Sequence, residues 1–266
     1  MHELDAPFPL PAGAVTDFRA RGFVRLKQVL SPELLMRYRS DLTRIVREKD
    51  GNAIPLEERD TYGRAFTQIF NLWREDSEAE RLMRSQRLAR IATELLGVTG
   101  VRLYHDQALY KEPRGGHTPW HCDQFYWPLS SDRTVTVWIP LQPVPMHVGP
   151  LAFAAGSHNL DNGRNLAISD DSEAHLARVL EGYEVIDEPF ELGEVSFHAG
   201  WTYHRAGPNQ SNDVRAVFTI IYMDKDMRLV EPTSNERRFD AEMWCPGVKV
   251  GEIIDSPINP VLYSRE

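Results

Sequence analysis

Cysteine is scarce in this sequence of 266 residues, which contains only Cys122 and Cys245. Two cysteines are too few for a disulfide framework or for a cysteine-rich zinc site, and they favour a reducing, cytoplasmic location. A single disulfide between them stays open at this stage.

Long apolar runs and an excess of positive charge are also missing. No stretch of 18 apolar residues occurs, and residues 1–7 lack the basic and apolar regions of a signal peptide, so we expect a protein that is neither exported nor embedded in a membrane. Lysine and arginine number 30 against 39 aspartates and glutamates, with no long run of like charges, which argues against a nucleic-acid partner. With 42% hydrophobic and 26% charged residues, the chain has the composition of a globular protein with a sizeable core.

Helical spacing dominates the first hundred residues. The sequence Ser-Pro-Glu at 31–33 supplies an N-cap, a proline suited to the first helical position and an acidic residue, so we expect a helix from there to Gly51. Residues 77–80 read as a capping box that begins a second helix, which Gly97 ends. Apolar residues recur at helical spacing in both segments, so both helices are expected to pack on a core.

A period of two residues replaces helical spacing after residue 100. Five segments rich in β-branched and aromatic residues alternate with Gly, Pro, Asn and Asp, which is typical of an antiparallel barrel or sandwich. These segments are Val101–Lys111, Arg133–Leu141, Tyr183–Phe190, Glu194–His198 and Val214–Met223. One helix, Asp170–Leu180, is expected among them. The predicted fold class is therefore α+β with a mainly β core, a double-sheet jelly roll with flanking N-terminal helices.

The length is compatible with one large domain or two, and the continuity of the pattern favours one domain over 1–266. We expect a helical part at about 1–100, the jelly-roll core at about 101–223 and a C-terminal extension at 224–266.

Residues 121–123, His-Cys-Asp, are the first candidates for chemistry. In an extended segment His121 and Asp123 project to the same face, so an imidazole and a carboxylate converge there. We expect His204 as the third member. It lies just before residues 207–213, which form a turn-rich loop between two strand-like stretches. A symmetric hairpin around this loop would make His204 and Arg215 cross-strand partners.

Two histidines and one carboxylate suit a non-haem Fe(II) centre with open positions that activates oxygen. An arginine beside it can clamp the far carboxylate of a 2-oxo acid through two hydrogen bonds. The alternative is that Arg215 pairs with a surface acid such as Asp213. Five other histidines stand alone in the sequence and carry no functional prediction; they are His105, His147, His158, His175 and His198.

Five ordered blocks of the sequence resemble the phytanoyl-CoA dioxygenase family of Fe(II)- and 2-oxoglutarate-dependent oxygenases. The blocks are Gln107–Lys111, Thr118–Gln124, Thr136–Leu141, Gly149–Leu151 with Gly156–His158, and Leu192–His198 running on to His204, Gly207, Pro208, Asn209 and Arg215. The resemblance implies a cupin-like double-stranded β-helix that covers roughly residues 104–223. Departures at Cys122, Val148 and Ala155 affect neighbours of the expected ligands rather than the ligands themselves.

The resemblance also implies roles for particular residues. It assigns iron to His121, Asp123 and His204, and the far carboxylate of 2-oxoglutarate to Arg215. Thr118, Gln107 and Trp138 match positions that line the 2-oxoglutarate site in relatives. Trp138 also shares strand parity with Thr134 and Thr136, which independently favours one polar and aromatic face. Because related halogenases carry a small residue in place of the aspartate, Asp123 favours hydroxylation.

The expected function is that of a dioxygenase which uses O2 and 2-oxoglutarate to hydroxylate a small organic molecule, either a secondary metabolite or a lipid-like acid, with release of succinate and CO2. Six aromatic residues near the ligand segments could line a substrate pocket or belong to the core; they are Trp120, Phe125, Tyr126, Trp127, Trp201 and Tyr203. The basic residues that could bind coenzyme A phosphates are scattered, at Lys111, Arg114, Arg133 and Arg164, which argues against phytanoyl-CoA itself.

Two alternatives remain open at this stage. The chain could be a cupin-like metalloprotein with isomerase or hydrolase activity, or a non-catalytic protein that binds a ligand. No feature of the sequence indicates an oligomeric state.

Overall fold

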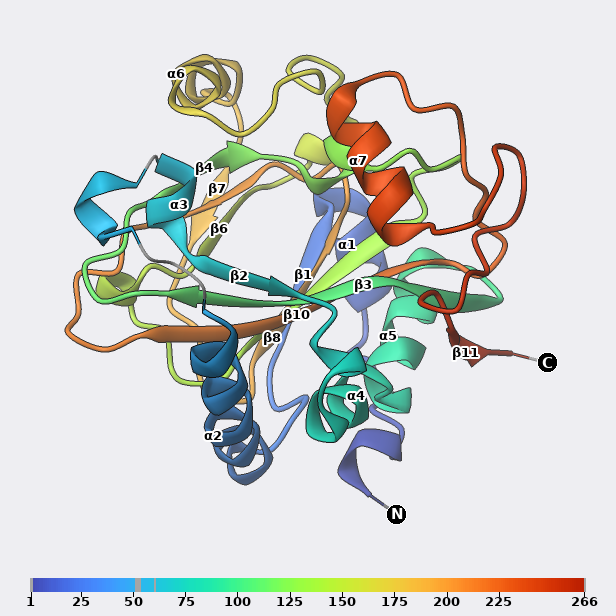
Figure 1. Cartoon of the computed structure of the whole chain (residues 1–266), viewed down its shortest axis with the longest axis horizontal. Helices are drawn as coiled ribbons and strands as arrows, with labels where there is room; N and C mark the ends of the chain where they lie inside the picture. The colour runs from blue at the N-terminus through green and yellow to red at the C-terminus, as the bar shows by residue number, and fades with distance from the viewer. Residues whose placement is uncertain (1, 51–53, 60, 266) are drawn as a thin grey trace.

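The computed structural model describes residues 2–50, 54–59 and 61–265 (Figure 1). The helices are α1 Ala14–Arg21, α2 Pro32–Lys49, α3 Thr61–Ala65, α4 Ser77–Met83, α5 Gln86–Leu96, α6 Asp170–Val179 and α7 Asn235–Trp244. The strands are β1 Phe23–Leu26, β2 Thr67–Phe70, β3 Gly100–Lys111, β4 Thr118–His121, β5 Thr134–Pro140, β6 Leu151–Ala154, β7 Val185–Asp187, β8 Val195–Ala199, β9 His204–Ala206, β10 Arg215–Asp224 and β11 Val261–Ser264. A short 3-10 helix, η4 Asp123–Tyr126, follows β4.

The strands form two antiparallel sheets. The larger sheet has the order β1-β8-β5-β10-β3-β11. Strand β2 belongs to the same sheet: β11 pairs with the first half of the outer edge of β3, and β2 pairs with the second half of that edge. The smaller sheet has the order β4-β9-β6-β7. The two sheets pack face to face, and the rings of Phe23 on β1 and Phe153 on β6 stack between them with centroids 4.4 Å apart. This is the predicted jelly roll.

Helices cover the outer face of the larger sheet. Along β5, Val135, Val137 and Ile139 point into the core shared with α2, α4 and α5, whereas Thr134, Thr136 and Trp138 point the other way, toward the smaller sheet. This confirms the expected division of β5 into an apolar and a polar-aromatic face, which follows from the two-residue period of a strand.

The predicted hairpin that joined His204 to Arg215 is wrong. β9 pairs with β4 and β6 in the smaller sheet, and β10 pairs with β3 and β5 in the larger one. His204 lies opposite His121, and Arg215 lies opposite Lys111. The turn-rich segment 207–213 therefore crosses from one sheet to the other instead of closing a hairpin.

The helix beginning at Pro32 is confirmed, with the Ser31 hydroxyl accepting a hydrogen bond from the Leu34 amide. It runs to Lys49, and the predicted stop at Gly51 lies outside the described residues. Helix α6 also lies where a helix was expected.

The predicted second helix is two helices, and the predicted capping box at its start is wrong. Asp76 rather than Ser77 caps α4, because its Oδ1 accepts hydrogen bonds from the amides of Glu78 and Ala79. Ser85 then begins α5 as a second N-cap, and Gly97 ends it in the left-handed conformation, as expected.

Some parts of the chain differ from their sequence-based description. The helical first hundred residues also supply β1 and β2, and the C-terminal extension supplies α7 and β11. Both cysteines are buried with free thiols, so the disulfide left open above does not form. In the part of the chain that the structure describes, no helix is long and apolar enough to cross a membrane.

Candidate active site

A cavity of about 530 Å³ lies between the two sheets. Along β3, the side chains of His105, Gln107 and Leu109 face it in turn, because alternate residues of a strand point to the same side. We call the end near Arg215 the arginine end and the end near α7 the helix end. The arginine end is lined by Gln107, Leu109, Thr118, Trp138, Leu151, Ala206 and Arg215, and the helix end by Phe70, His105, Tyr126, Trp127, Phe239, Asp240 and Trp244.

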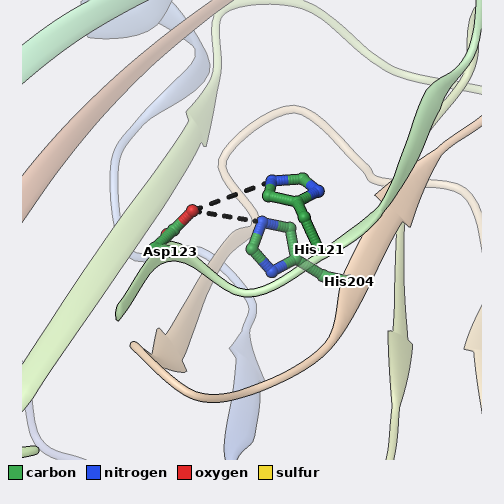
Figure 2. A group of neighbouring side chains, drawn as sticks. All are labelled: His121, Asp123 and His204. Atoms are coloured by element: carbon green, nitrogen blue, oxygen red, sulfur yellow. Dashed lines mark ion pairs between the residues drawn. The ribbon is translucent and has the colours of Figure 1, made fainter. Parts of the chain in front are cut away.

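His121, Asp123 and His204 all line the cavity, and their side chains point toward one another (Figure 2). His121 ends β4, Asp123 begins η4 two residues later, and His204 begins β9 directly opposite His121. The Asp123 Oδ1 atom lies 3.7 Å from His121 Nε2 and 3.6 Å from His204 Nε2. The three ligand atoms all lie within 4.8 Å of one another, which is close enough to share one metal ion.

Backbone carbonyls orient both imidazoles. His121 Nδ1 donates to the Pro119 carbonyl at 2.7 Å, and His204 Nδ1 donates to the Thr202 carbonyl at 3.0 Å. Because Nδ1 carries the proton, the Nε2 lone pairs are left to face Asp123, which is the arrangement that metal-ligating histidines need. Burial lowers the pKa of His121 and of His204 to about 4, so both rings are neutral near pH 7. This donor set fits a divalent iron ion.

The second oxygen of Asp123 is already engaged. Asp123 Oδ2 accepts hydrogen bonds from Thr136 Oγ1 at 3.0 Å and from His198 Nε2 at 3.4 Å. Burial alone would raise the pKa of the Asp123 carboxyl, but the neighbouring imidazoles of His204 and His198 lower it below its usual range. Asp123 therefore offers only Oδ1 toward the two ligand histidines.

His198 contacts the candidate ligand Asp123, and it was not among the site residues expected from the sequence. It is buried, and it is the cross-strand partner of Thr136 in the pairing of β8 with β5. Its sequence signals were its position in a predicted strand and at the end of the block Leu192–His198. Neither places it beside Asp123, because the strand order that does so depends on distant parts of the chain.

Arg215 lies in the same cavity, although not as the cross-strand partner of His204. Its side chain is buried, Nη1 donates to the Gly149 carbonyl at 2.6 Å, and the guanidinium carbon lies 5.6 Å from the centre of the Trp138 ring. Its Nε has no hydrogen-bond partner among the described residues. Burial lowers the pKa of Arg215 to about 10, which still leaves it charged at pH 7. An unsatisfied buried guanidinium fits the far carboxylate of a 2-oxo acid.

The other predicted contacts of 2-oxoglutarate also line the cavity. Thr118 is buried and accepts a hydrogen bond from Lys111 Nζ at 3.3 Å. Gln107 is hydrogen-bonded to Gln68 on β2, and Trp138 presents its ring between the sheets. The structure thus places all seven predicted site residues on one cavity.

The helix end of the cavity is mostly aromatic. His105 lies against Phe70 and Trp244, with ring centroids 5.4 and 4.9 Å away. Asp240 accepts a hydrogen bond from the Tyr104 hydroxyl at 3.1 Å. Burial lowers the pKa of His105 to about 4 and raises the pKa of Asp240 to about 7. This end therefore offers aromatic surface and polar groups of low charge.

The six aromatic residues near the ligand segments divide between pocket and core. Tyr126 and Trp127 line the cavity. The remaining four pack in or against a separate buried cluster beneath α6; they are Trp120, Phe125, Trp201 and Tyr203.

A comparison with protein families matches residues 18–217 to the family model described as Phytanoyl-CoA dioxygenase (PhyH). This range spans most of the chain and includes every predicted site residue.

Curated relatives match over part of their length. The chain is 29% identical over 156 residues to a probable alpha-ketoglutarate-dependent hypophosphite dioxygenase of Stutzerimonas stutzeri, covering 55% of this chain and 53% of that protein. It is also 29% identical over 150 residues to the 1-deoxypentalenic acid 11-beta-hydroxylase of Streptomyces exfoliatus, covering 54% and 50%. The chain thus spans about half the length of the curated relatives it matches.

Among solved structures, the fold is similar to that of SnoK, a non-heme alpha ketoglutarate dependent carbocyclase from nogalamycin biosynthesis. The TM-score is 0.79 at 24% identity, and the match covers 97% of this chain and all of the other. This similarity confirms the jelly-roll fold.

Proposed function

Because the chain belongs to the phytanoyl-CoA dioxygenase family, we propose that it is an Fe(II)- and 2-oxoglutarate-dependent dioxygenase that hydroxylates a small organic molecule and releases succinate and CO2. The observation that carries this proposal is the meeting of His121, Asp123 and His204 with Arg215 in one cavity. Two neutral imidazoles and one carboxylate oxygen suit a non-haem Fe(II) centre with open positions, and a guanidinium suits the far carboxylate of a 2-oxo acid.

His121, Asp123 and His204 would hold the iron and leave its other positions open to small molecules. When bound, iron supplies the oxygen activation that couples oxidation of 2-oxoglutarate to oxidation of the substrate. Thr136 and His198 hold the second oxygen of Asp123, so that its first oxygen keeps its direction toward the metal.

Arg215 binds the far carboxylate of 2-oxoglutarate in this proposal. Its hydrogen bond to the Gly149 carbonyl and its contact with Trp138 fix the guanidinium, so the Arg215 side chain loses little conformational entropy when 2-oxoglutarate binds. Thr118, Gln107 and Trp138 complete the walls of this end. The buried position of these groups keeps water away from the reacting molecules.

The substrate would occupy the helix end of the cavity. Its aromatic walls favour an apolar or ring-containing molecule, such as a secondary metabolite or a lipid-like acid. One relative is named for the hydroxylation of an organic acid, 1-deoxypentalenic acid, which supports this class.

The basic residues named as candidates for coenzyme A phosphates do not form a cluster in the described part of the chain. Lys111 is buried, Arg133 pairs with Asp224, and Arg164 pairs with Asp161. A thioester of coenzyme A is therefore not part of the proposal.

The two alternatives predict different behaviour. A cupin-like isomerase or hydrolase would act without oxygen and without 2-oxoglutarate, and a binding protein would take up its ligand without forming succinate. Neither gives a reason for a buried arginine with an unsatisfied Nε beside the three metal-binding groups. We therefore favour the dioxygenase.

The test is an anaerobic titration of the Fe(II)-loaded protein with 2-oxoglutarate, followed by the weak visible absorption band of the chelate. We expect the band in the wild type and a much weaker response in Arg215→Ala. The matched control is Arg133→Ala, which removes an arginine outside the cavity and should behave as the wild type. Bound iron without any band in the wild type would refute the assignment.

We further propose that residues 1–266 form one domain, because the larger sheet contains both the first strand, β1, and the last strand, β11. The cytoplasmic location, and the absence of nucleic-acid and membrane partners, stay predictions from composition.

A further inference from the structure

Two buried cations lie side by side at the arginine end. Lys111 on β3 is the direct cross-strand partner of Arg215 on β10, and the two residues are 0% and 2% exposed. Like charges directly opposite each other on a sheet are destabilising, and burial of each charge adds to the cost. In the described part of the chain, no ion pair includes Lys111 or Arg215. The nearest acid along the chain, Glu112, pairs with Arg59 instead.

Lys111 is held by neutral groups only. Its Nζ donates to the Gly116 carbonyl at 2.5 Å, to the Gly207 carbonyl at 3.0 Å and to the Thr118 hydroxyl at 3.3 Å. The two carbonyls and the hydroxyl match the three N–H donors of the ammonium ion, although burial and the charge of Arg215 lower the pKa of Lys111. In the ammonium form the surrounding residues solvate the positive charge but do not neutralise it.

The same loops anchor both cations. Gly149, whose carbonyl accepts from Arg215, lies so close to Gly207 that a Cβ on Gly149 would be 2.2 Å from the Gly207 carbonyl oxygen. The Asn209 side chain donates to the carbonyls of Lys111 and Glu112, tying the loop after β9 to the end of β3. These contacts fix the ammonium behind the wall of the cavity and the guanidinium on it.

Thr118 connects the lysine to the cavity. Because its hydroxyl oxygen accepts from Lys111, its hydroxyl hydrogen remains free to donate to a bound anion. Thr118 itself lines the cavity beside Arg215, whereas Lys111 does not. Lys111 can therefore act on a ligand through its charge and through Thr118, without touching it.

We propose that Lys111 is a specificity-determining positioning residue: with Arg215 it makes the arginine end a site of two positive charges that selects 2-oxo acids ending in a second carboxylate. This inference rests on the proposed function and assigns the selection of the cosubstrate to a residue outside the cavity wall. Binding of the dicarboxylate places a negative charge in the cavity beside Arg215 and near Lys111, which offsets the repulsion between the two cations.

The experiment measures the affinity of the anaerobic Fe(II)-loaded protein for two 2-oxo acids of equal length, 2-oxoglutarate and 2-oxovalerate. They differ only in a terminal carboxylate or methyl group. Dissociation constants come from equilibrium titration by calorimetry, so that the readout does not depend on turnover. Wild type, Lys111→Met and Lys111→Gln are compared, and Gln keeps two N–H donors in case the Met variant does not fold. Lys225→Gln controls for the loss of one positive charge, because Lys225 lies just past the end of β10 that is far from Arg215 and pairs with Asp226.

We expect both Lys111 variants to bind 2-oxoglutarate about tenfold more weakly, which is the order expected for loss of one charge at an effective dielectric constant of about 20. Their affinity for 2-oxovalerate should stay within about twofold of wild type, and Lys225→Gln should change neither. An equal loss for both acids, or no loss for either, would overturn the proposal, since a merely structural lysine would not change the ratio. A wild type that does not bind 2-oxoglutarate would instead refute the proposed function, and this inference with it.

Discussion

Replacement of Thr136 by valine tests whether hydrogen bonds to Asp123 set the affinity for metal. The change keeps the shape of the side chain and removes one hydroxyl, which donates to Asp123 Oδ2 at 3.0 Å. His198 Nε2 still donates to the same oxygen, but over a longer distance of 3.4 Å. The carboxylate therefore loses its shorter support and keeps its longer one.

The magnitude follows from the charge on the acceptor. A hydrogen bond to a charged group contributes about 1.5–3 kcal/mol, and each 1.4 kcal/mol changes an equilibrium constant about tenfold. Because the hydrogen bond from His198 still orients Asp123 in part, we expect a free-energy loss in the lower part of this range, which corresponds to a fall in Fe(II) affinity of about tenfold. This agrees with the general effect of removing a partner of a metal ligand.

The assay is an anaerobic Fe(II) titration of the wild type and two valine variants. Thr134→Val is the matched control, because Thr134 lies two residues earlier on the same face of β5 but donates to Gln124 Oε1. We expect Thr136→Val to bind iron about tenfold more weakly and Thr134→Val to bind it as the wild type does. Equal affinities for the wild type and Thr136→Val, with both proteins folded, would show that this hydrogen bond does not position Asp123.

Three further predictions concern stability and binding. Burial raises the pKa of Asp106 to about 7, so the folded chain keeps this proton at a higher pH than the unfolded chain, and the free energy of unfolding should fall by up to about 4 kcal/mol as the pH rises from about 4 to about 7. Asp106→Asn should flatten this decline in urea unfolding curves measured at several pH values, and an unchanged slope would contradict the assignment. Gly149→Ala should lower the free energy of unfolding by about 1–3 kcal/mol and weaken 2-oxoglutarate binding, because Gly149 has a φ of +80° and an added Cβ would meet the Gly207 carbonyl. Unfolding and binding titrations check this, and a variant as stable as the wild type would refute it. Removal of Fe(II) by a chelator should lower Tm in the wild type and leave Tm of His204→Ala unchanged, because an ion that binds only the folded state stabilises that state. An equal fall of Tm in both proteins would argue against His204 as a metal ligand.

The metal-binding group was predictable where local geometry decides it. His121 and Asp123 share a face because alternate residues of an extended segment do so, and that rule needs no knowledge of the rest of the fold. The same rule placed Thr136 and Trp138 on the face of β5 that meets the cavity.

Pairings between distant strands were not predictable. A turn-rich loop commonly joins neighbouring strands, but segment 207–213 crosses between the sheets, so His204 pairs with His121 and Arg215 with Lys111. Arg215 was nevertheless expected in the correct cavity, because the resemblance to the family did not depend on the hairpin. His198 was missed for the same reason that the hairpin was wrong: strand order is a property of the whole chain.

Helix boundaries failed where two neighbouring residues compete for one role. Asp76 and Ser77 are both good N-cap residues, and Asp76 caps the helix because its carboxylate accepts hydrogen bonds from two amides. The break before α5 was hidden because apolar residues keep their helical spacing across Ser85.

The division of the site between two sheets has a mechanical consequence. The groups expected to hold iron belong to the smaller sheet and the turn after β4, while Arg215 and Trp138 belong to the larger sheet. A molecule held by both sets is a cross-link between two layers that otherwise meet through side-chain packing and through hydrogen bonds such as those of Thr136 and His198 to Asp123. Occupation of the cavity should therefore reduce breathing of one sheet against the other, so that the catalytic assembly becomes rigid only when its small molecules are in place.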